Sequence, residues 1–380
     1  MKIALVCPYD YEQPGGVQSH IRELAQVLGD RHHQVKVITP KTANCQENSA
    51  QIIRVGNSQR IKFQGTQIDL SLAVGDEYQF LKETLQKEKF DVIHYHTIWN
   101  PLLSWQILLL SKAANVATFH DTPRQTLFGK LAHSILMPRV SEWLLKHYLN
   151  AAIAVSEIPA TYLRRSPSKQ ISVIPNGIFL DRFSNNSPFS QYLDGKLNLL
   201  FLGRLEARKG IFYLLKAFVI LKQKFPQIRL IIAGDGYQKN AVNQFIAHRQ
   251  LTDVILLGFI SEEDKPKYYA TCDIYCSPAF DGESFGIVLV EAMASGKPAA
   301  GAANLGYKTI LTGKGEELLV IPKSVDNLVR KLAQLIENQA FRSEMGAWGK
   351  AAAQQYDWQV IVKQIEKVYQ QALEKNLQAR

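Results

Sequence analysis

The chain has 380 residues, of which 46% are apolar and 21% charged, and its formal net charge is +10. This length fits two domains, and the evenly spread apolar residues exclude a disordered chain. No stretch approaches the ~20 apolar residues that span a bilayer. The positive charge favours phosphate-bearing ligands or an anionic membrane surface as partners. Nucleic acid is disfavoured because no zinc spacing, aromatic RNA-binding signature or basic helical arm occurs.

The cysteines and the first residues favour a cytoplasmic location. Cys7, Cys45, Cys272 and Cys276 form no metal-binding pattern. Cys272 and Cys276 fall in one predicted strand, where four residues span roughly 13 Å, too far for a disulfide. The N-terminus predicts a core strand instead of a signal peptide. We expect a cytoplasmic protein, with a peripheral position on the inner face of the cytoplasmic membrane as a further option.

Short apolar runs alternate with helical-period segments along the whole chain. The first series predicts buried parallel strands at 2–7, 35–39, 91–94, 116–119, 152–155 and 171–174. The second series predicts strands at 197–202, 229–233, 254–257 and 274–277. Helices are predicted at 17–29, 210–225, 285–294 and 357–374. This rhythm is typical of two Rossmann-like, doubly wound α/β domains.

A polar segment separates the two series. Residues 181–195 are rich in Asn, Ser, Asp and Gly, as expected of a linker. We therefore predict an N-terminal domain over 1–185 and a C-terminal domain over 196–356, followed by a final helical segment, 357–380.

The segment 127–149 mixes apolar and basic residues. Between Thr122 and Gln170 the sequence has seven Lys or Arg against two acids. One interpretation is a basic amphipathic surface that docks on anionic lipid. The other is two ordinary amphipathic helices that cover the sheet.

The most specific motif is GESFGIVLVEAMASG at 282–296. It predicts a short turn followed by a helix, whose free N–H groups and positive dipole end suit a diphosphate. Glu283 and Glu291 would lie roughly 12 Å apart along such a helix. Two carboxylates at that spacing could accept hydroxyl groups of a hexose and a ribose on either side of a diphosphate. Gly286 would let the backbone approach the phosphate closely.

A second motif, GRLEARKG at 203–210, follows a predicted strand. Arg204 and Lys209 are expected to project into the same site and to neutralise a leaving nucleoside diphosphate, while Arg208 faces solvent. No Asp-x-Asp pair occurs in the sequence, which favours a site without a metal.

Two further features carry weaker signals. Pro14-Gly15-Gly16-Val17 lacks the full dinucleotide fingerprint and is either a phosphate-approaching turn or a plain tight turn. His94-Tyr95-His96 places two histidines on one face of a strand, but the sequence indicates no third metal ligand. We expect these histidines to have a cleft or acceptor role or to pack in the core, and we predict no metal site.

Together these stretches resemble the retaining group 4 glycosyltransferases with the GT-B fold, over essentially the whole chain. The resemblance includes IPNG at 174–177 and AGDG at 233–236. Within that family the sequence is most similar to the bacterial phosphatidylinositol mannosyltransferases. The shared strings are GGVQSHI at 15–21, ATFH at 117–120, GESFGIVLVEAMA at 282–294 and YDW at 356–358.

The resemblance implies two Rossmann-like domains facing each other across a cleft, with the last helix packed back on the N-terminal domain. It implies catalytic roles for Glu283, His120, Arg204 and Lys209, with His120 beside the reacting sugar and Glu291 on the ribose. The implied sugar-nucleotide site comprises Gly16, Arg204, Lys209, Ile260, Glu283, Ser284, Phe285, Gly286, Ile287 and Glu291. The implied acceptor site comprises Tyr9, Gln18, His96 and Arg124. No metal and no cofactor other than the sugar nucleotide is implied.

The resemblance also implies the reaction, which is retaining, metal-independent transfer of a hexose from a GDP-mannose or UDP-glucose type of donor to a lipid or glycan. Ser261 stands where the mannosyltransferases have an Asp that reads guanine, which leaves UDP open. Residues 121–124, Asp-Thr-Pro-Arg, depart from the subgroup and leave the acceptor open. A soluble or lipid-linked saccharide acceptor and a non-catalytic sugar-nucleotide-binding module are the alternatives.

Overall fold

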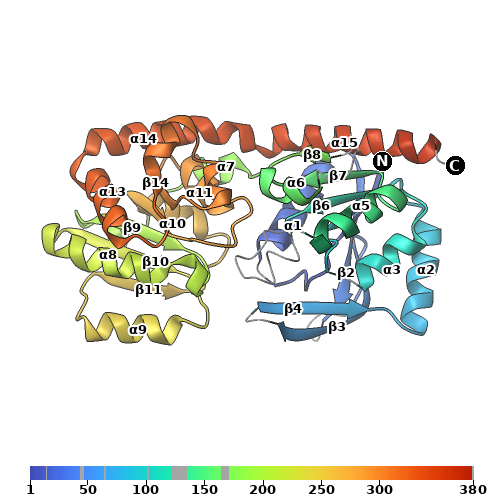
Figure 1. Ribbon diagram of the computed structural model, residues 1–380, viewed down its shortest axis with the longest axis horizontal. Coiled ribbons are helices and arrows are strands. Elements are labelled where there is room, and N and C mark those ends of the chain that lie inside the picture. The colour runs from blue at the N-terminus through green and yellow to red at the C-terminus, as the bar shows by residue number, and fades with distance from the viewer. Residues whose placement is uncertain are drawn as a thin grey trace. The chain divides into compact units, whose positions relative to one another are not determined.

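The computed structural model describes residues 1–13, 15–42, 47–63, 66–100, 102–120, 135–163 and 171–378. The chain divides into two compact units. Unit 1 comprises Met1–Gly177 and Trp358–Arg380, and unit 2 comprises Ile178–Asp357 (Figure 1).

Unit 1 is built on an eight-stranded sheet in the order β4-β3-β2-β1-β5-β6-β7-β8. All neighbouring pairs are parallel except β3 and β4, which are antiparallel. The strands are β1 (Lys2–Val6), β2 (Gln34–Lys41), β3 (Ile52–Phe63), β4 (Thr66–Leu72), β5 (Val92–His96), β6 (Ala114–Phe119), β7 (Ala151–Ala154) and β8 (Ile171–Val173). The central strands β1, β5, β6 and β7 are almost wholly buried, which explains their continuous apolar runs.

Helices cover both faces of this sheet. Those that contribute to its large apolar core are α2 (Asp76–Glu88), α3 (Leu103–Leu110), α5 (Met137–His147) and α6 (Glu157–Leu163). The opposite face is covered by α1 (Gly16–Asp30) and α15 (Trp358–Gln378), and α15 packs against β6, β7 and α1. Glu366 of α15 joins Arg31 at 2.7 Å, and Tyr369 donates to or accepts from His94 Nδ1 at 2.7 Å.

Unit 2 contains a six-stranded sheet in the order β11-β10-β9-β12-β13-β14, in which every neighbouring pair is parallel. The strands are β9 (Leu197–Leu202), β10 (Ile228–Ala233), β11 (Val254–Gly258), β12 (Ile274–Ser277), β13 (Ala299–Ala302) and β14 (Leu319–Val320). The helices are α7 (Leu180–Ser184), α8 (Ile211–Lys224), α9 (Lys239–His248), α10 (Lys265–Thr271), α11 (Ile287–Ala294), α12 (Leu305–Lys308), α13 (Val325–Glu337) and α14 (Gln339–Ala352). Helices α8 and α13 pack side by side, as do α11 and α14 (Figure 1).

The parallel sheets and intervening helices confirm the predicted α/β class, and β9 and β12 have the predicted bounds. The predicted linker is wrong, because the boundary lies after Gly177 and residues 178–195 belong to unit 2. There Phe183 of α7 packs edge-on against Tyr269, with the ring centroids 5.9 Å apart. Cys272 ends α10 and does not share a strand with Cys276. Both thiols are buried and free.

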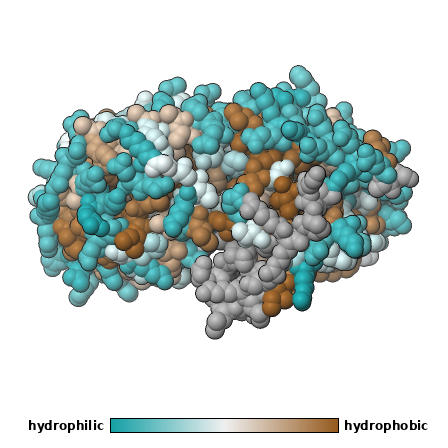
Figure 2. All heavy atoms as spheres, turned by 45° about the horizontal axis from the view of Figure 1, so that its top comes forward, coloured by the Kyte–Doolittle hydropathy of each residue, from teal (hydrophilic) through white to brown (hydrophobic). Residues whose placement is uncertain are grey.

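Hydrophilic side chains prevail on the face shown in Figure 2, where apolar side chains form separate patches. Among the described helices, none is long and apolar enough to cross a membrane.

Candidate active site

Two turns at the ends of adjacent strands meet around Glu283 in unit 2. The chain leaves β9 into a single 3-10 turn, Ala207–Lys209, and it leaves β12 into the turn that carries Glu283. Lys209 Nζ lies 2.6 Å from Glu283 Oε1, and the two side chains are only 16% and 10% exposed. Arg208 Nη1 approaches the same oxygen at 3.4 Å and donates to the carbonyl of Gly282 at 3.2 Å. The Glu283 carboxylate, which lies beyond the carboxyl ends of β9 and β12, is therefore held between two cations.

The arginines differ from their predicted positions. Arg208 was expected to face solvent, but its side chain is 29% exposed and contacts Glu283. Arg204 was expected to point into the site, but its side chain is 64% exposed and pairs with Glu206 at 3.0 Å. Glu206 also accepts from Arg208 at 2.9 Å. Charges of opposite sign thus alternate from Arg204 through Glu206 and Arg208 to Glu283. The 3-10 turn directs the side chains of Arg208 and Lys209 toward the same oxygen of Glu283.

The helix after Glu283 begins at a backbone position that requires glycine. Gly286 has φ +109°, and a Cβ there would lie 2.6 Å from the ring of Tyr307. Within the described part of the chain, no side chain caps the N-terminus of α11, and its first turn contains no acidic residue. Its first N–H groups and the positive end of its dipole are therefore available to an anion. Gly286 thus has a conformational reason to be glycine, in addition to the predicted approach of the backbone to phosphate.

Glu291 is buried in the middle of α11 and has two partners. Its Oε1 lies 2.8 Å from Lys265 Nζ, and its Oε2 accepts from the Tyr269 hydroxyl at 2.9 Å. Burial lowers the pKa of Lys265, but the charges of Glu291 and Glu262 outweigh that effect and raise it. Lys265 therefore stays protonated and holds the Glu291 carboxylate in place by an ion pair. No sequence motif indicated either partner.

A second layer supports the turn that carries Glu283. Asn304 caps α12 by accepting from Tyr307 N at 2.9 Å, and its amide donates to Ala279 O at 2.7 Å. The Tyr307 hydroxyl reaches Ser277 Oγ at 2.6 Å. A Cβ at Gly306 would lie 2.4 Å from the carbonyl oxygen of Glu283, so this glycine allows α12 to approach the turn. No sequence motif indicated a role for these residues.

The remaining predicted donor residues lie in the same unit. Ser284 and Phe285 belong to the Glu283 turn, and Ile287 is the first residue of α11. The Phe285 ring is buried and lies edge-on to Tyr356, with centroids 5.4 Å apart. Ile260 follows β11 and is half-buried. Ser261, at the position of the missing Asp, accepts from Asp264 N and donates to its carboxylate, both at 3.0 Å.

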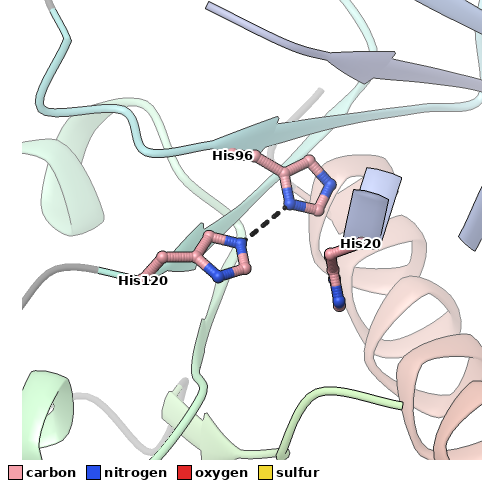
Figure 3. A group of neighbouring side chains, drawn as sticks. All are labelled: His20, His96 and His120. Atoms are coloured by element: carbon pink, nitrogen blue, oxygen red, sulfur yellow. Dashed lines mark hydrogen bonds between the residues drawn. The ribbon is translucent and has the colours of Figure 1, made fainter. Parts of the chain in front are cut away.

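Unit 1 brings three histidines together on the face covered by α1 and α15. His96 ends β5, His120 follows β6, and His20 comes from α1. His96 Nδ1 and His120 Nε2 are 3.1 Å apart, and the ring centroids of His20 lie 5.4 Å and 5.1 Å from those of His96 and His120 (Figure 3). The sequence suggested no third partner for His94 and His96, because nothing in it indicated that His20 lies beside them.

Burial sets the charge of these imidazoles. It lowers the pKa of His94 to about 3 and that of His120 to about 4. Burial, followed by the charges of neighbouring histidines, also holds the pKa values of His20 and His96 well below the usual range. All four rings are therefore neutral near pH 7. His94 uses both nitrogens, bonding Tyr369 at 2.7 Å and Thr118 at 2.6 Å.

The other predicted residues of unit 1 surround the start of α1. Gly15 is the N-cap of α1, and among the described residues no side chain caps this end and no atom lies within 4 Å of a Cβ built at Gly16. Gln18 Nε2 donates to Asp10 O at 3.4 Å. Tyr9 is half-buried, and its carbonyl accepts from Thr39 at 3.0 Å. Arg124, the predicted acceptor contact, lies outside the described residues.

Comparison with family models and known proteins agrees with this arrangement. Residues 14–182 match the model described as Glycosyltransferase Family 4, and residues 184–355 match that of glycosyl transferases group 1. A phosphatidyl-myo-inositol mannosyltransferase of Mycobacterium tuberculosis is 32% identical over 97% of this chain and 97% of its own. A protein of the same name from Mycobacterium leprae is 31% identical over 97% of this chain and 96% of its own.

Solved structures share the fold over both units. A sucrose-phosphate synthase from Thermosynechococcus elongatus superposes with a TM-score of 0.76 at 22% identity, over 98% of this chain and 99% of its own. The Anabaena protein HepE, in complex with UDP and glucose, gives a TM-score of 0.73 at 20% identity, over 97% and 98% of the two chains. The chain is an enzyme with the GT-B fold and belongs to the family 4 glycosyltransferases.

Proposed function

We propose that this glycosyltransferase transfers a hexose from a sugar nucleotide to a lipid acceptor, with retention of configuration and without a metal ion. Unit 2 binds the donor and unit 1 binds the acceptor. The observation that carries the proposal is the pairing of Glu283 with Lys209 beside the uncapped N-terminus of α11. This group combines an acceptor for sugar hydroxyls with fixed positive charge for a diphosphate.

The positive groups suit the departing nucleoside diphosphate. Lys209 is held by its contact with Glu283, and the N–H groups of α11 are fixed by the helix, so neither has to reorganise as charge develops. Arg204 is largely exposed, and among the described residues it pairs with Glu206 in an exchangeable ion pair. We propose that a diphosphate draws Arg204 away from Glu206. One preorganised charge of this kind typically contributes about 3–4 kcal/mol to transition-state stabilisation.

The reaction step conserves atoms and charge. The bond between the anomeric carbon and the phosphate oxygen breaks, and the nucleoside diphosphate leaves with the bonding pair. The acceptor oxygen forms a new bond to the anomeric carbon on the same face, and its proton passes to the departing phosphate. Glu283 and His120 orient the sugar by hydrogen bonding and form no covalent intermediate. His120 is suited to this role because burial keeps it neutral, with one nitrogen able to donate.

Glu291 supplies the second acceptor, for the ribose hydroxyls. Its carboxylate has about four lone-pair sites, of which Lys265 and Tyr269 occupy two. The relatives' name favours mannose as the sugar. The Ser261–Asp264 pair leaves the base open, because Ser261 is engaged within its own turn. GDP-mannose and UDP-glucose are therefore the first donors to compare.

The acceptor we propose is an anionic lipid, and the exposed side of α5 supports this choice. Ile135, Leu136 and Trp143 are 43%, 58% and 42% exposed, and Arg139 and Lys146 are exposed among them. Such a mixture suits the interface of an anionic membrane. The inward side of α5 buries Leu144 and Leu145, so the helix also covers the sheet. The first part of the segment 127–149, up to residue 134, lies outside the described residues.

One experiment tests the reaction. The purified chain is incubated with UDP-glucose or GDP-mannose and a bacterial lipid extract, in the presence of EDTA, and products are identified by mass spectrometry and anomeric NMR. We expect one retained glycolipid product in wild type and none with Glu283→Ala or Lys209→Ala. Lys239→Ala, an exposed lysine of α9 whose partner is Asp235, is the matched control. Activity that requires a divalent ion, or normal turnover in either site variant, contradicts the proposal.

Calorimetric titration with UDP and GDP measures donor binding independently of turnover. Binding without conversion of any donor contradicts the proposed transfer. Membrane docking is tested by sedimentation with anionic vesicles, where Trp143→Ala should bind less than wild type. Leu193→Ala, which alters a 64% exposed leucine of unit 2, is the control.

A further inference from the structure

We propose that His20, His96 and His120 bind a transition-metal ion such as Zn²⁺, and that the bound ion inhibits sugar transfer. All three proposed metal ligands belong to unit 1, so the metal binding does not depend on the proposed function. The inhibition rests on the proposed function, because it requires that His120 orient the transferred sugar.

The spacing of the three imidazole rings is close to that of the ligands of a metal ion. Each histidine offers one nitrogen, and the three nitrogens lie within 4.8 Å of one another. Tetrahedral zinc with Zn–N bonds of about 2.05 Å places its ligand nitrogens about 3.3 Å apart. His96 Nδ1 and His120 Nε2, at 3.1 Å, already have this spacing. The His20 ring lies beside this pair in Figure 3, and its nitrogen must approach them further for the ion to bind all three.

The chemistry of the imidazole rings also suits a metal ion. Imidazole binds a metal through the lone pair of a ring nitrogen, and it is among the ligands that suit zinc and cobalt. Among the described residues, His20 Nδ1 and His96 Nε2 are buried without a hydrogen-bond partner. Such orphaned polar atoms destabilise a fold, and a metal ion bound at His20 Nδ1 would give that nitrogen a partner.

The neighbours of the cluster define what kind of site it is. His94 lies against His96, with ring centroids 4.3 Å apart, but it is no ligand because Tyr369 and Thr118 occupy both nitrogens. The described group contains three histidines and no carboxylate or thiolate. Three neutral ligands leave zinc its full charge and an open fourth position, which suits an exchangeable ion better than a permanent structural one.

Inhibition follows from the use of His120 in both processes. His120 Nε2 lies 3.1 Å from His96 Nδ1 before any ion binds, and coordination replaces that hydrogen bond and fixes the ring on the metal. A sugar that requires a different orientation of the His120 ring then loses that contact. The ion would also place positive charge beside a sugar that becomes positively charged as its phosphate leaves.

Binding is tested by titrating the chelator-treated full chain with Co²⁺ and recording the visible d–d absorption of low-symmetry cobalt. We expect one Co²⁺ per chain, displaced by Zn²⁺, and an increase in thermal midpoint with Zn²⁺. His20→Gln should weaken Co²⁺ binding at least tenfold. His248→Gln, an exposed histidine of α9, should bind as wild type does. No cobalt signal in wild type, or equal affinity in the wild type and His20→Gln, overturns the site.

The activity assay then separates this proposal from the proposed function. Zn²⁺ should inhibit product formation over the concentration range in which it displaces Co²⁺, and EDTA should restore activity. Transfer without Co²⁺ binding overturns the metal site alone. Co²⁺ binding without transfer from any donor overturns the proposed function and leaves the metal site standing. Transfer that persists with the site saturated by Zn²⁺ overturns the inhibition.

Discussion

Replacing Lys265 with methionine should destabilise unit 2 strongly, because it leaves the Glu291 carboxylate without its cation. The side chains of Lys265 and Glu291 are 13% and 6% exposed, and their charged atoms are 2.8 Å apart. Methionine keeps most of the length of the lysine side chain, so the packing changes little. The substitution therefore isolates the charge.

The expected magnitude follows from burial. Removing one partner of a buried ion pair typically costs about 3–5 kcal/mol, since the other charge stays desolvated. Glu291 retains the hydrogen bond from Tyr269 at 2.9 Å, which places the effect near the lower end, at about 3 kcal/mol. Unit 2 spans Ile178–Asp357, and in a domain of that size each kcal/mol shifts the thermal midpoint by roughly 2–4 °C. The midpoint should fall by roughly 6–12 °C.

Differential scanning calorimetry of the full chain, with two controls, measures this effect. Lys267→Met alters the same helix at a 47% exposed lysine that pairs with Asp264, and it should cost at most about 1 kcal/mol. The double variant Lys265→Met/Glu291→Gln removes both charges and should recover most of the lost stability. A shift in Lys265→Met as small as that in Lys267→Met would refute the reasoning, as would a double variant no more stable than the single one.

Three other predictions concern local geometry, pH and catalysis. Gly286→Ala should destabilise by about 1–3 kcal/mol in calorimetry because of its positive φ, whereas Gly16→Ala, with open space around it, should not. The hydrogen bond from Arg31 lowers the pKa of the Glu366 carboxyl in the folded state. The contribution of this contact to folding stability is therefore complete above the unfolded-state pKa of about 4.3, and it is lost as the pH falls through the folded-state pKa of Glu366. In denaturant unfolding, Glu366→Gln should therefore be less stable than wild type at pH 6, with the difference shrinking at pH 3. Arg208→Ala should reduce kcat/KM about 10²-fold in the transfer assay, since it contacts Glu283, and an unchanged value would contradict that role.

Strands with continuous apolar runs were predictable, and strands of other kinds were not. LNLLFL and IYCS are buried on both faces and stand out as β9 and β12. In contrast, β3 and β4 form an antiparallel pair at the sheet edge, where polar residues alternate with apolar ones. β13, with the sequence AAGA, contains only small residues of low strand propensity, and it forms a strand because it pairs with β12 on one side and β14 on the other. Such strands depend on tertiary pairing that a local pattern does not contain.

The candidate donor site was predictable as a meeting of two loops but not in its detailed contacts. The motifs at 203–210 and 282–296 follow β9 and β12, which pair with each other, so Lys209 and Glu283 converge. Which arginine joins them depends on a three-residue 3-10 turn, in which one residue more or less redirects a side chain by about 120°. The long side chain of an arginine can also reach several acceptors, and that of Arg204 pairs with Glu206.

The histidine cluster obeys the same topological rule as the donor site. β5 and β6 are parallel neighbours, with His96 paired to Thr118, so His96 and His120 emerge at the same carboxyl edge of the sheet. Helix α1 follows β1, the other neighbour of β5, and its first turns carry His20 to that edge. Open α/β sheets bind ligands at the carboxyl ends of their strands, where the order of the connections reverses. Three histidines distant in sequence therefore meet because the order of the strands demands it, and their position at this edge is a reason to test them as ligands instead of treating them as core residues.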